Sequence, residues 1–496
     1  MGDVIGPRLE GRVLAREWFA IDVRSLAALR IALALLTLLD VVARARLLPA
    51  FYTDAGVVPR SLVSSGLPPV HLSLHMWSGG ITWPVVLHIV LVAAALSLLV
   101  GWHTRIATAV TWLLLVSLHL RNEYVLQAGD LLLHQLLFWC MFLPVAAVWS
   151  LDARRGAPSV RVAGGTVLCW AGAALMLQVA AVYLTAGLSK LHGSPWLDGT
   201  AVAYAVGQDI WARALGVWLR DKAALITALT YAVIAIELVG PFALFAPVHG
   251  RRLRVVALVA FLSLQVGMAF SIDLKYFPFI SSAALLPFVP REAWDASLAR
   301  LRRWVPLRAV KPPGLATELP DPVEPGSRAS ATRSARDACM AAMIAFVVWA
   351  NVAAVSRVTM PSGLASVGRA LAMDQHWQMY SPSPYEYNFR LTVIGLRRDS
   401  SVVTVDDWGE STTWPPLERL RNDHPTRSYL EFVADQVAQD EHLALGAWTC
   451  RIWNESHDPG GRLIAVALIR WAREIRLDGS TAAPEETVLQ AQECPS

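Results

Sequence analysis

The sequence predicts a polytopic α-helical membrane protein with about eight or nine spans, followed by a C-terminal soluble α+β domain. Hydrophobic residues make up 55% of its 496 residues, whereas roughly 45–50% is usual for a soluble domain. Charged residues make up only 17%, against roughly 25% in soluble proteins. Long apolar segments recur until about residue 355 and then stop. These observations exclude a disordered chain and argue against a purely soluble multidomain protein.

Apolar segments of spanning length are the first element of this prediction, since a membrane helix needs roughly 20 mostly apolar residues. The segment Met1–Arg24 is polar and contains arginines, so we expect no cleavable signal peptide, and the first apolar helix remains as an anchor. The segment Phe277–Pro290 is short and either spans the membrane or re-enters it, which leaves eight or nine spans. The candidate spans are Leu26–Val42, Pro84–Gly101, Ile106–Leu120, Leu131–Trp149, Gly164–Leu188, Ala223–Pro247, Val255–Ile272, Phe277–Pro290 and Ala338–Val355.

The distribution of charge predicts the orientation. From Met373 onward the chain carries 19 Asp and Glu against 11 Lys and Arg, so this part is acidic and the preceding part is basic. In a membrane protein, an excess of positive charge usually determines the orientation in the membrane and does not indicate binding of nucleic acid. Arginines cluster on alternate loops, which places the N-terminus in the cytoplasm and, with nine spans, the C-terminus outside. We therefore predict a multi-pass protein of the cell's inner (plasma) membrane. The clusters lie in 8–24, at 105, in 154–161, in 251–254 and in 291–337.

The domain organisation follows from these spans. We predict a cytoplasmic N-terminal segment (1–24), a transmembrane helical domain (25–290), a cytoplasmic basic and proline-rich linker (291–337), a last transmembrane helix (338–356) and an extracytoplasmic α+β domain (357–496). The linker prediction rests on Pro312–Ser334, which is rich in Pro, Ser and Gly. In the last domain, alternation predicts strands at Asn388–Leu396 and Val402–Val405, and a β-rich run predicts another at Leu463–Ile469. Helical periodicity predicts a helix at Arg427–Gln439.

The cysteines bear on the compartment of the C-terminal domain. Cys450 and Cys494 both lie in it, and they can pair if the domain is outside the cell; otherwise they are two unrelated thiols. No CxxC pair occurs, and no set of ligands has convincing metal-site spacing. We therefore expect no metal.

Ionisable residues inside apolar spans are costly and are functional candidates for that reason. With the predicted topology most of them lie in the outer half of the membrane, as a site open to the outside requires. The alternative is a set of helix caps and inter-helix hydrogen bonds. These residues are Arg30, Asp40, His88, His119, Asp130, His134, Lys190 and Glu237.

Lys190 stands out because the chain uses arginine almost everywhere else. Of 43 Lys and Arg residues only four are lysines: Lys190, Lys222, Lys275 and Lys311. Lysine can lose its proton when it is desolvated, whereas arginine effectively cannot. We therefore expect Lys190 to be held at least partly neutral in an apolar pocket, where it can act as a general base. An ionised Glu237 close by would oppose this, and a lysine that only snorkels at the interface is the alternative.

Several motifs resemble those of the horizontally transferred transmembrane (HTTM) domain family, which includes the vitamin K-dependent gamma-carboxylase. The signature is Tyr183-Leu-Thr-Ala-Gly-Leu-Ser-Lys190-Leu-His-Gly-Ser-Pro-Trp196-Leu-Asp-Gly199. Further matching pieces include Ser117–Asn122, Gly129-Asp130, Glu237–Pro241, Phe277-Pro278 and, in the tail, Gln375–Pro384. The resemblance covers nearly the whole chain.

The resemblance implies a chemistry. In the carboxylase, reduced vitamin K and oxygen generate a strong base that removes a γ-proton from peptide glutamate, and carbon dioxide adds to the carbanion. An uncharged lysine deprotonates the hydroquinone, and Lys190 matches its position. The resemblance thus implies reduced vitamin K or menaquinone as cofactor and a glutamate-containing peptide or protein as client, in addition to membrane lipid. If the protein is such an enzyme, we expect Lys190 to be the base and the other catalytic candidates, Glu237, Asp130 and His134, to tune it or to bind substrate. The substrate-binding candidates are Trp196, Gln265, Arg121 and Asn122.

Three departures from the carboxylase pattern keep a second hypothesis open. Ser189 precedes Lys190 where the carboxylase has a second lysine, the region Asn122–Asp130 contains no histidine, and Gln265 stands where a histidine is expected before the Phe-Pro element. The first hypothesis is a quinone-dependent carboxylase-like enzyme or a related oxidoreductase. The second is a non-enzymatic membrane maturation, immunity or export partner that binds a client through its C-terminal domain.

Overall fold

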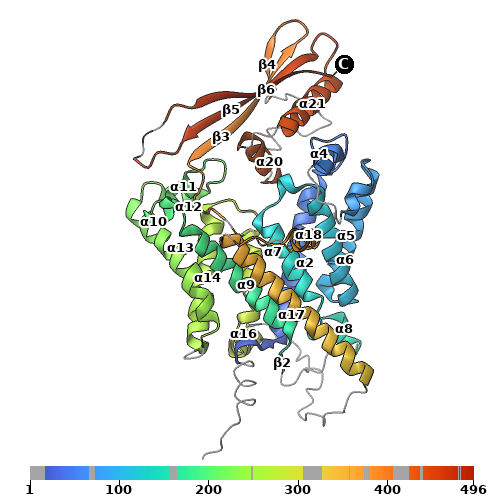
Figure 1. Ribbon diagram of the computed structural model, residues 1–496, viewed down its shortest axis with the longest axis vertical. Coiled ribbons are helices and arrows are strands. Elements are labelled where there is room, and N and C mark those ends of the chain that lie inside the picture. Colours follow the sequence, from blue (N-terminus) through green and yellow to red (C-terminus); the bar gives the residue numbers. More distant parts are fainter. Residues whose placement is uncertain are drawn as a thin grey trace, which may run out of the picture.

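The computed structural model describes residues 17–65, 73–156, 165–246, 250–304, 327–356, 358–373, 375, 377, 379–405, 424–435, 439–478, 480 and 482–495. A helical bundle forms most of the molecule, and a region of strands and helices covers one end of it (Figure 1). Within these residues, six helices are long and apolar enough to cross a membrane. They are α2 (Val23–Ala45), α5 (Thr82–Val100), α9 (Trp170–Lys190), α13 (Ala223–Leu244), α14 (Gly250–Ser271) and the apolar part Ala338–Val355 of α17 (Ser327–Val355).

Three of the predicted spans are not among these six helices. Ile106–Leu120 lies in α6 (Thr104–Arg121), which is long enough but carries an arginine close to each end. Leu131–Trp149 is replaced by the shorter α7 (Ala128–Cys140), because the chain turns before Pro144, which cannot continue a helix. Phe277–Pro290 forms α15 (Phe277–Ala284) and the 3₁₀ turn η4 (Leu286–Phe288), interrupted at Pro287. The latter two helices are apolar because the bundle buries them.

Short elements connect the bundle. Asp22 caps the start of α2 by accepting the backbone N–H of Arg24, and β1 pairs with β2 beside it. At the same end, buried Arg30 donates to the carbonyl oxygens of Leu98 and Trp149, which satisfies the end of α5. These elements are β1 (Ile21–Asp22), α3 (Leu48–Phe51), α4 (Arg60–Ser65), η1 (Leu74–Trp77), η2 (Glu123–Val125), α8 (Leu151–Arg154), β2 (Thr166–Val167), α10 (Ser194–Leu197), α11 (Ala201–Gly207), α12 (Ala214–Leu219) and α16 (Arg291–Trp304).

The linker prediction needs correction at both ends. Arg291–Trp304 is helix α16, and α17 begins at Ser327, eleven residues before the predicted start of the last span at Ala338. Residues 305–326, which include most of the proline-rich stretch, lie outside the described residues, as do residues 1–16 of the N-terminal segment. Helical structure therefore includes polar segments on both sides of the linker, which hydropathy alone assigns to a loop.

The C-terminal region contains a four-stranded antiparallel sheet of order β4-β3-β5-β6. Each of the three predicted strands overlaps an observed one, and β3 pairs with β5 over the full length of β3. The elements are α18 (Ser362–Ala370), β3 (Tyr387–Arg397), β4 (Val402–Thr404), α20 (His424–Asp435), α21 (Gln439–Ser456), β5 (Leu463–Glu474) and β6 (Glu485–Glu493). The prediction missed α18, α21 and β6.

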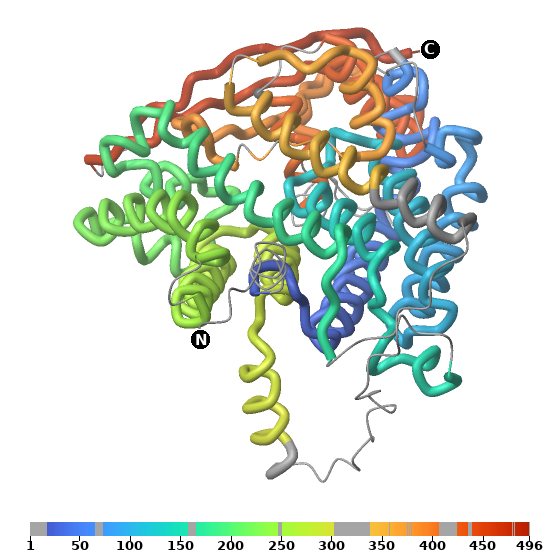
Figure 2. The backbone as a smooth tube through the Cα atoms, turned by 60° about the horizontal axis from the view of Figure 1, so that its bottom comes forward, coloured from blue at the N-terminus to red at the C-terminus, as the bar shows by residue number. Residues whose placement is uncertain are grey.

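Two helices of the C-terminal region, α20 and α21, connect its sheet to the bundle. Helix α20 contacts β3 and η2, and α21 contacts β5 and α4 (Figures 1 and 2). Aromatic rings continue the core across this boundary: Tyr429 lies 5.5 Å from Phe51 and Phe432 lies 4.9 Å from Tyr124, centroid to centroid. The C-terminal region thus packs on the end of the bundle where α2, α6 and α9 finish.

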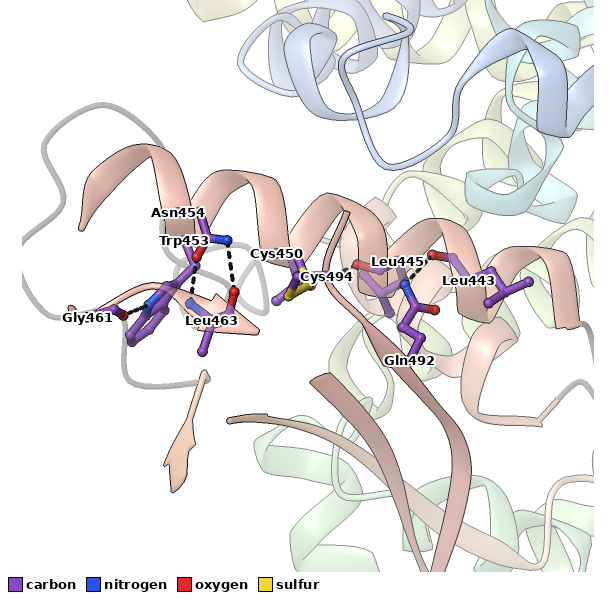
Figure 3. The surroundings of a disulfide bond; sticks show 10 residues. Leu443, Leu445, Cys450, Trp453, Asn454, Gly461, Leu463, Gln492 and Cys494 are labelled. Atoms are coloured by element: carbon purple, nitrogen blue, oxygen red, sulfur yellow. Dashed lines mark hydrogen bonds between the residues drawn. A yellow bond between two sulfur atoms is a disulfide. The ribbon is translucent and has the colours of Figure 1, made fainter. Parts of the chain in front are cut away.

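A disulfide joins Cys450 on α21 to Cys494 after β6, with the two Cα atoms 5.5 Å apart (Figure 3). The predicted pair is therefore formed in the structure. Nearby, Gln492 donates to the carbonyl oxygen of Leu443, so β6 is held to α21 by a covalent bond and a hydrogen bond. The outer strand depends on this attachment because on its other side it has no strand neighbour within the described sheet.

We expect the double variant Cys450→Ser, Cys494→Ser to destabilise the C-terminal region by about 2–4 kcal/mol, because the unfolded chain loses the closure of a loop. Thermal unfolding of purified protein with and without reductant measures this change. A wild-type protein whose unfolding and intact mass do not respond to reductant would contradict the bond.

Candidate active site

A buried ion pair joins the end of α9 to the middle of α13. The ammonium nitrogen Nζ of Lys190 lies 2.8 Å from Glu237 Oε2, and the two side chains are 3% and 8% exposed. The helices approach closely because residue 187 is glycine: a Cβ there would lie 3.0 Å from the Cβ of Glu237. Glu237, the carboxylate expected from the sequence to oppose a neutral Lys190, is thus in direct contact with it.

Trp196 completes this arrangement from α10. Its ring centroid lies 5.0 Å from Lys190 Nζ, and its indole N–H donates to the backbone oxygen of Tyr380 in the C-terminal region. The same segment of the C-terminal region lies against Gly193, where a Cβ would overlap the backbone oxygen of Pro382. The signature turn after Lys190 is therefore the place where the tail docks on the bundle.

Lys190, Glu237, Trp196 and Gln265 line one cavity of about 1000 Å³. Its deeper walls come from α9, α13 and α14 and are largely apolar, for example at Ile236, Leu264 and Met268 (the elements are seen in Figure 1). Its outer wall comes from the C-terminal region: residues 379–385 and helix α20. The cavity therefore combines an apolar interior with an ion pair and a polar outer rim.

Gln265 presents an unused acceptor to this cavity. Its amide nitrogen donates to the Tyr183 hydroxyl at 3.0 Å, while its buried oxygen Oε1 has no hydrogen-bond partner among the described residues. A buried acceptor without a partner costs free energy, so such atoms at a cavity wall are suited to accept a hydrogen bond from a ligand. An O–H or N–H group bound in the cavity would satisfy it.

Asp130 and His134 lie in a different cluster, a buried charge network between α2, α6 and α7. Arg44 joins its two carboxylates, with 2.8 Å to Asp40 and 2.9 Å to Asp130. His134 lies 2.6 Å from His119, which in turn lies 3.3 Å from Asp40. Lys275 also pairs with Asp40. Neither Asp130 nor His134 lines the cavity of Lys190, although their neighbours Gln127 and Ala128 do.

This buried charge network includes Asp40, His119 and Asp130, whose ligand atoms lie close enough together to hold a metal ion. Arg44 and Lys275 already supply two positive charges to the two carboxylates. A divalent cation would have to displace them, so the donor set does not fit a metal well.

Arg121 and Asn122 lie outside the lining of the cavity among the described residues. Arg121 donates to the backbone oxygen of Val58, and Asn122 donates to that of Phe51 and accepts the backbone N–H of Tyr124. Both side chains hold loops at the end of the bundle. These contacts give them structural tasks and no direct access to a substrate in this cavity.

The family model of the HTTM domain matches residues 19–294, which is more than half of the chain. The chain belongs to the HTTM domain family. HTTM domains are found in vitamin K-dependent gamma-carboxylase-like membrane proteins. No curated protein and no solved structure matches the chain.

The HTTM domain contains the ion pair, Trp196 and Gln265, whereas the outer wall of the cavity comes from residues beyond its matched range. His424, at the start of α20, lies near its rim and contacts Gln127 of the bundle at 2.6 Å and the backbone oxygen of Asp273 at 3.0 Å. Burial lowers the pKa of His424 to about 4. Sequence reasoning missed this residue, since nothing in the local pattern shows which tail residues reach the bundle.

We expect the docking of the C-terminal region to weaken as the pH falls from 6.5 to 4. His424 is neutral in the folded protein but takes up a proton when unfolded, so its contribution is present above about pH 6.5 and is lost toward its folded pKa of about 4. The change is on the order of 1–3 kcal/mol. Thermal unfolding across this pH range measures it, and His424→Gln should flatten the dependence. An equally steep profile in this variant would show that other groups titrate.

Proposed function

We propose that this HTTM protein is a membrane enzyme in which the Lys190–Glu237 pair exchanges a proton with a quinol-type molecule bound in the adjoining cavity. The reaction is of the quinone-dependent carboxylase type or a related oxidoreductase reaction. The observation that carries the proposal is the position of the only described buried lysine: it faces an apolar cavity, beside a carboxylate and an aromatic ring.

The lining of the cavity fits a reduced vitamin K or menaquinone. The apolar side chains of α13 and α14 suit an isoprenoid-bearing ring, and Gln265 Oε1 offers an acceptor for a ring hydroxyl. When bound, such a group supplies reducing equivalents and, with oxygen, a strong base. Gln265 would orient the ring, and Trp196 would cover the ammonium side of the site.

The ion pair can supply a base without any change in net charge. Transfer of one proton from Lys190 Nζ to Glu237 Oε2 converts two charges into a neutral amine and a neutral acid, which a low-dielectric site favours. The amine can then accept the proton of a bound hydroxyl group. Glu237 is thus both the partner that holds Lys190 in place and the reservoir for its proton. This role explains why lysine, and not arginine, is needed at this position.

A glutamate-containing peptide or protein is the client that we propose for the carboxylase reading. The polar rim of the cavity supports this, since Gln127, His424 and Ser428 meet there at the junction of bundle and tail. A client that approaches from the side of the C-terminal region would reach this rim first.

Quinone content and turnover test the proposal together. We expect protein purified in native lipid to retain a quinone and to fix labelled carbon dioxide into glutamate peptides when supplied with reduced quinone and oxygen. Lys190→Arg should reduce turnover by at least 100-fold while expression and unfolding remain close to wild type. The matched control is Lys222→Arg, since Lys222 also pairs with an acid and lies near a tryptophan, but its side chain is 40% exposed. Full turnover in Lys190→Arg would disprove the base.

A non-enzymatic client-binding role is the second candidate, and it is favoured by Gln265, whose amide cannot act as a base in the place where the carboxylase has a histidine. In that case quinone is absent from the purified protein, and a client is captured equally by wild type and Lys190→Arg. These outcomes separate the two functions.

We further propose that the N-terminus faces the cytoplasm and that the C-terminal region lies outside the plasma membrane. The disulfide supports this orientation, because such bonds persist in oxidising compartments. We expect a membrane-impermeant thiol reagent to label Glu455→Cys, on exposed α21, in intact cells. Arg155→Cys, at the opposite end of the bundle, should react only after permeabilisation. The reverse pattern would invert the topology.

A further inference from the structure

A second hollow lies on the outside of the bundle, between the last turns of α17 and helix α18. This α17–α18 groove has a volume of about 560 Å³ and is separate from the cavity of Lys190. Its walls are mainly apolar and include Phe346, Ala350, Ala354, Val358, Met360 and Ala365. Small residues on α17 create this space, and residues of α18 form its other wall.

The groove lies where a spanning helix ends. The apolar part of α17, Ala338–Val355, is long enough to cross a membrane, so its last turn marks the boundary between hydrocarbon and water. Apolar side chains are exposed on both sides of this point: Trp349 and Val352 on α17, and Leu364 and Val367 on α18. An amphipathic helix with such a face lies at the membrane interface. The groove is therefore open to lipid.

Among the described residues that line the groove, one carries a charged side chain. This is Arg369 on α18, whose side chain is exposed and makes no hydrogen bond or ion pair with the part of the chain that the structure describes. By contrast, the polar residue at its floor is fully used: Gln375 Oε1 accepts from Gln178 and Trp377, and its amide nitrogen donates to Met373. In the residues that the structure describes, the groove thus combines apolar walls with the exposed guanidinium group of Arg369.

We propose that the α17–α18 groove binds an anionic phospholipid, with an acyl chain along the apolar walls and the phosphate against Arg369. A guanidinium group binds phosphate with two parallel hydrogen bonds, and basic pockets beside membrane helices select anionic head groups. The acyl chain removes apolar wall surface from contact with other lipids and fixes α18 against α17. This site goes beyond the proposed enzymatic function and does not depend on it.

Native mass spectrometry of the full-length protein, titrated with dioleoylphosphatidylglycerol, tests the proposal. We expect one tightly held lipid in the wild type and about tenfold weaker retention in Arg369→Gln. Arg369→Lys should retain part of the affinity because it keeps the charge. The matched control is Arg105→Gln, an exposed arginine at the opposite membrane surface, which should bind as the wild type does.

Two further measurements distinguish a lipid site from general charge attraction. Ala353→Phe should fill the groove and prevent retention although Arg369 remains, with unchanged disulfide formation as a check on folding. Dioleoylphosphatidylcholine and the water-soluble head group glycerophosphoglycerol should both bind at least tenfold more weakly. Equal binding of the head group alone, equal retention in Arg369→Gln, or an equal loss in Arg105→Gln would each overturn the site.

Discussion

Glu237→Leu should destabilise the bundle by about 3–5 kcal/mol, because it leaves the ammonium of Lys190 buried without a partner. The double variant Lys190→Met, Glu237→Leu should recover most of this loss, since two apolar side chains of similar volume can replace a buried ion pair at little cost. Unfolding in mixed micelles, followed by near-UV circular dichroism, measures all three proteins. The pair lies between α9 and α13, so the unfolding of these helices reports on it directly.

The stability and the activity of the double variant together distinguish a structural role of the pair from a catalytic one. If the pair is only structural, the double variant should be stable and fully functional. If Lys190 is the base, the double variant should be stable and inactive, and Lys190→Arg should behave likewise. A double variant that remains as unstable as Glu237→Leu would show that the pair contributes more than charge neutralisation to packing.

The sequence alone could predict the features that depend on composition. Each of the six spanning helices contains a long apolar stretch, the buried residues of β3 alternate along one face, and β5 is rich in apolar residues, so local patterns reveal these elements. The short helices α7 and α15 misled the prediction, because burial inside a bundle and burial inside a bilayer favour the same residues. Strand β6 was invisible, since most of its side chains are polar and it is held by pairing and by the disulfide.

Four of the predicted site residues, Lys190, Glu237, Trp196 and Gln265, line the cavity, whereas the sequence did not reveal that the others lie elsewhere. The cost of burying charge pointed to Lys190, Glu237 and Asp130 separately. Their distribution over two clusters depends on helix packing, which no local pattern records. The contribution of the C-terminal region is a further example: Tyr380 and His424, far apart in the sequence, both contact the bundle through the docking of this region. Such contacts depend on tertiary structure alone.

The largest loss of stability should follow from Arg44→Met, because Arg44 is the link between Asp40 and Asp130 in the buried charge network. Its side chain is 1% exposed, and its removal leaves Asp130 without a cation. Lys275 still pairs with Asp40, so the network is left with two carboxylates and one compensating charge. We expect a loss of at least about 3–5 kcal/mol and poor insertion of the protein.

The exposed pair Arg60 and Asp54 provides the matched control, since it has a similar distance of 2.7 Å but side chains that are 34% and 41% exposed. Arg60→Met should cost no more than about 1 kcal/mol, because water replaces the lost partner. In the Arg44→Met background, Asp130→Asn should restore part of the stability by removing the unpaired charge, while Asp54→Asn should not. Similar losses in Arg44→Met and Arg60→Met would show that water reaches the network, and α2, α6 and α7 would then be held together by apolar packing instead of by charge.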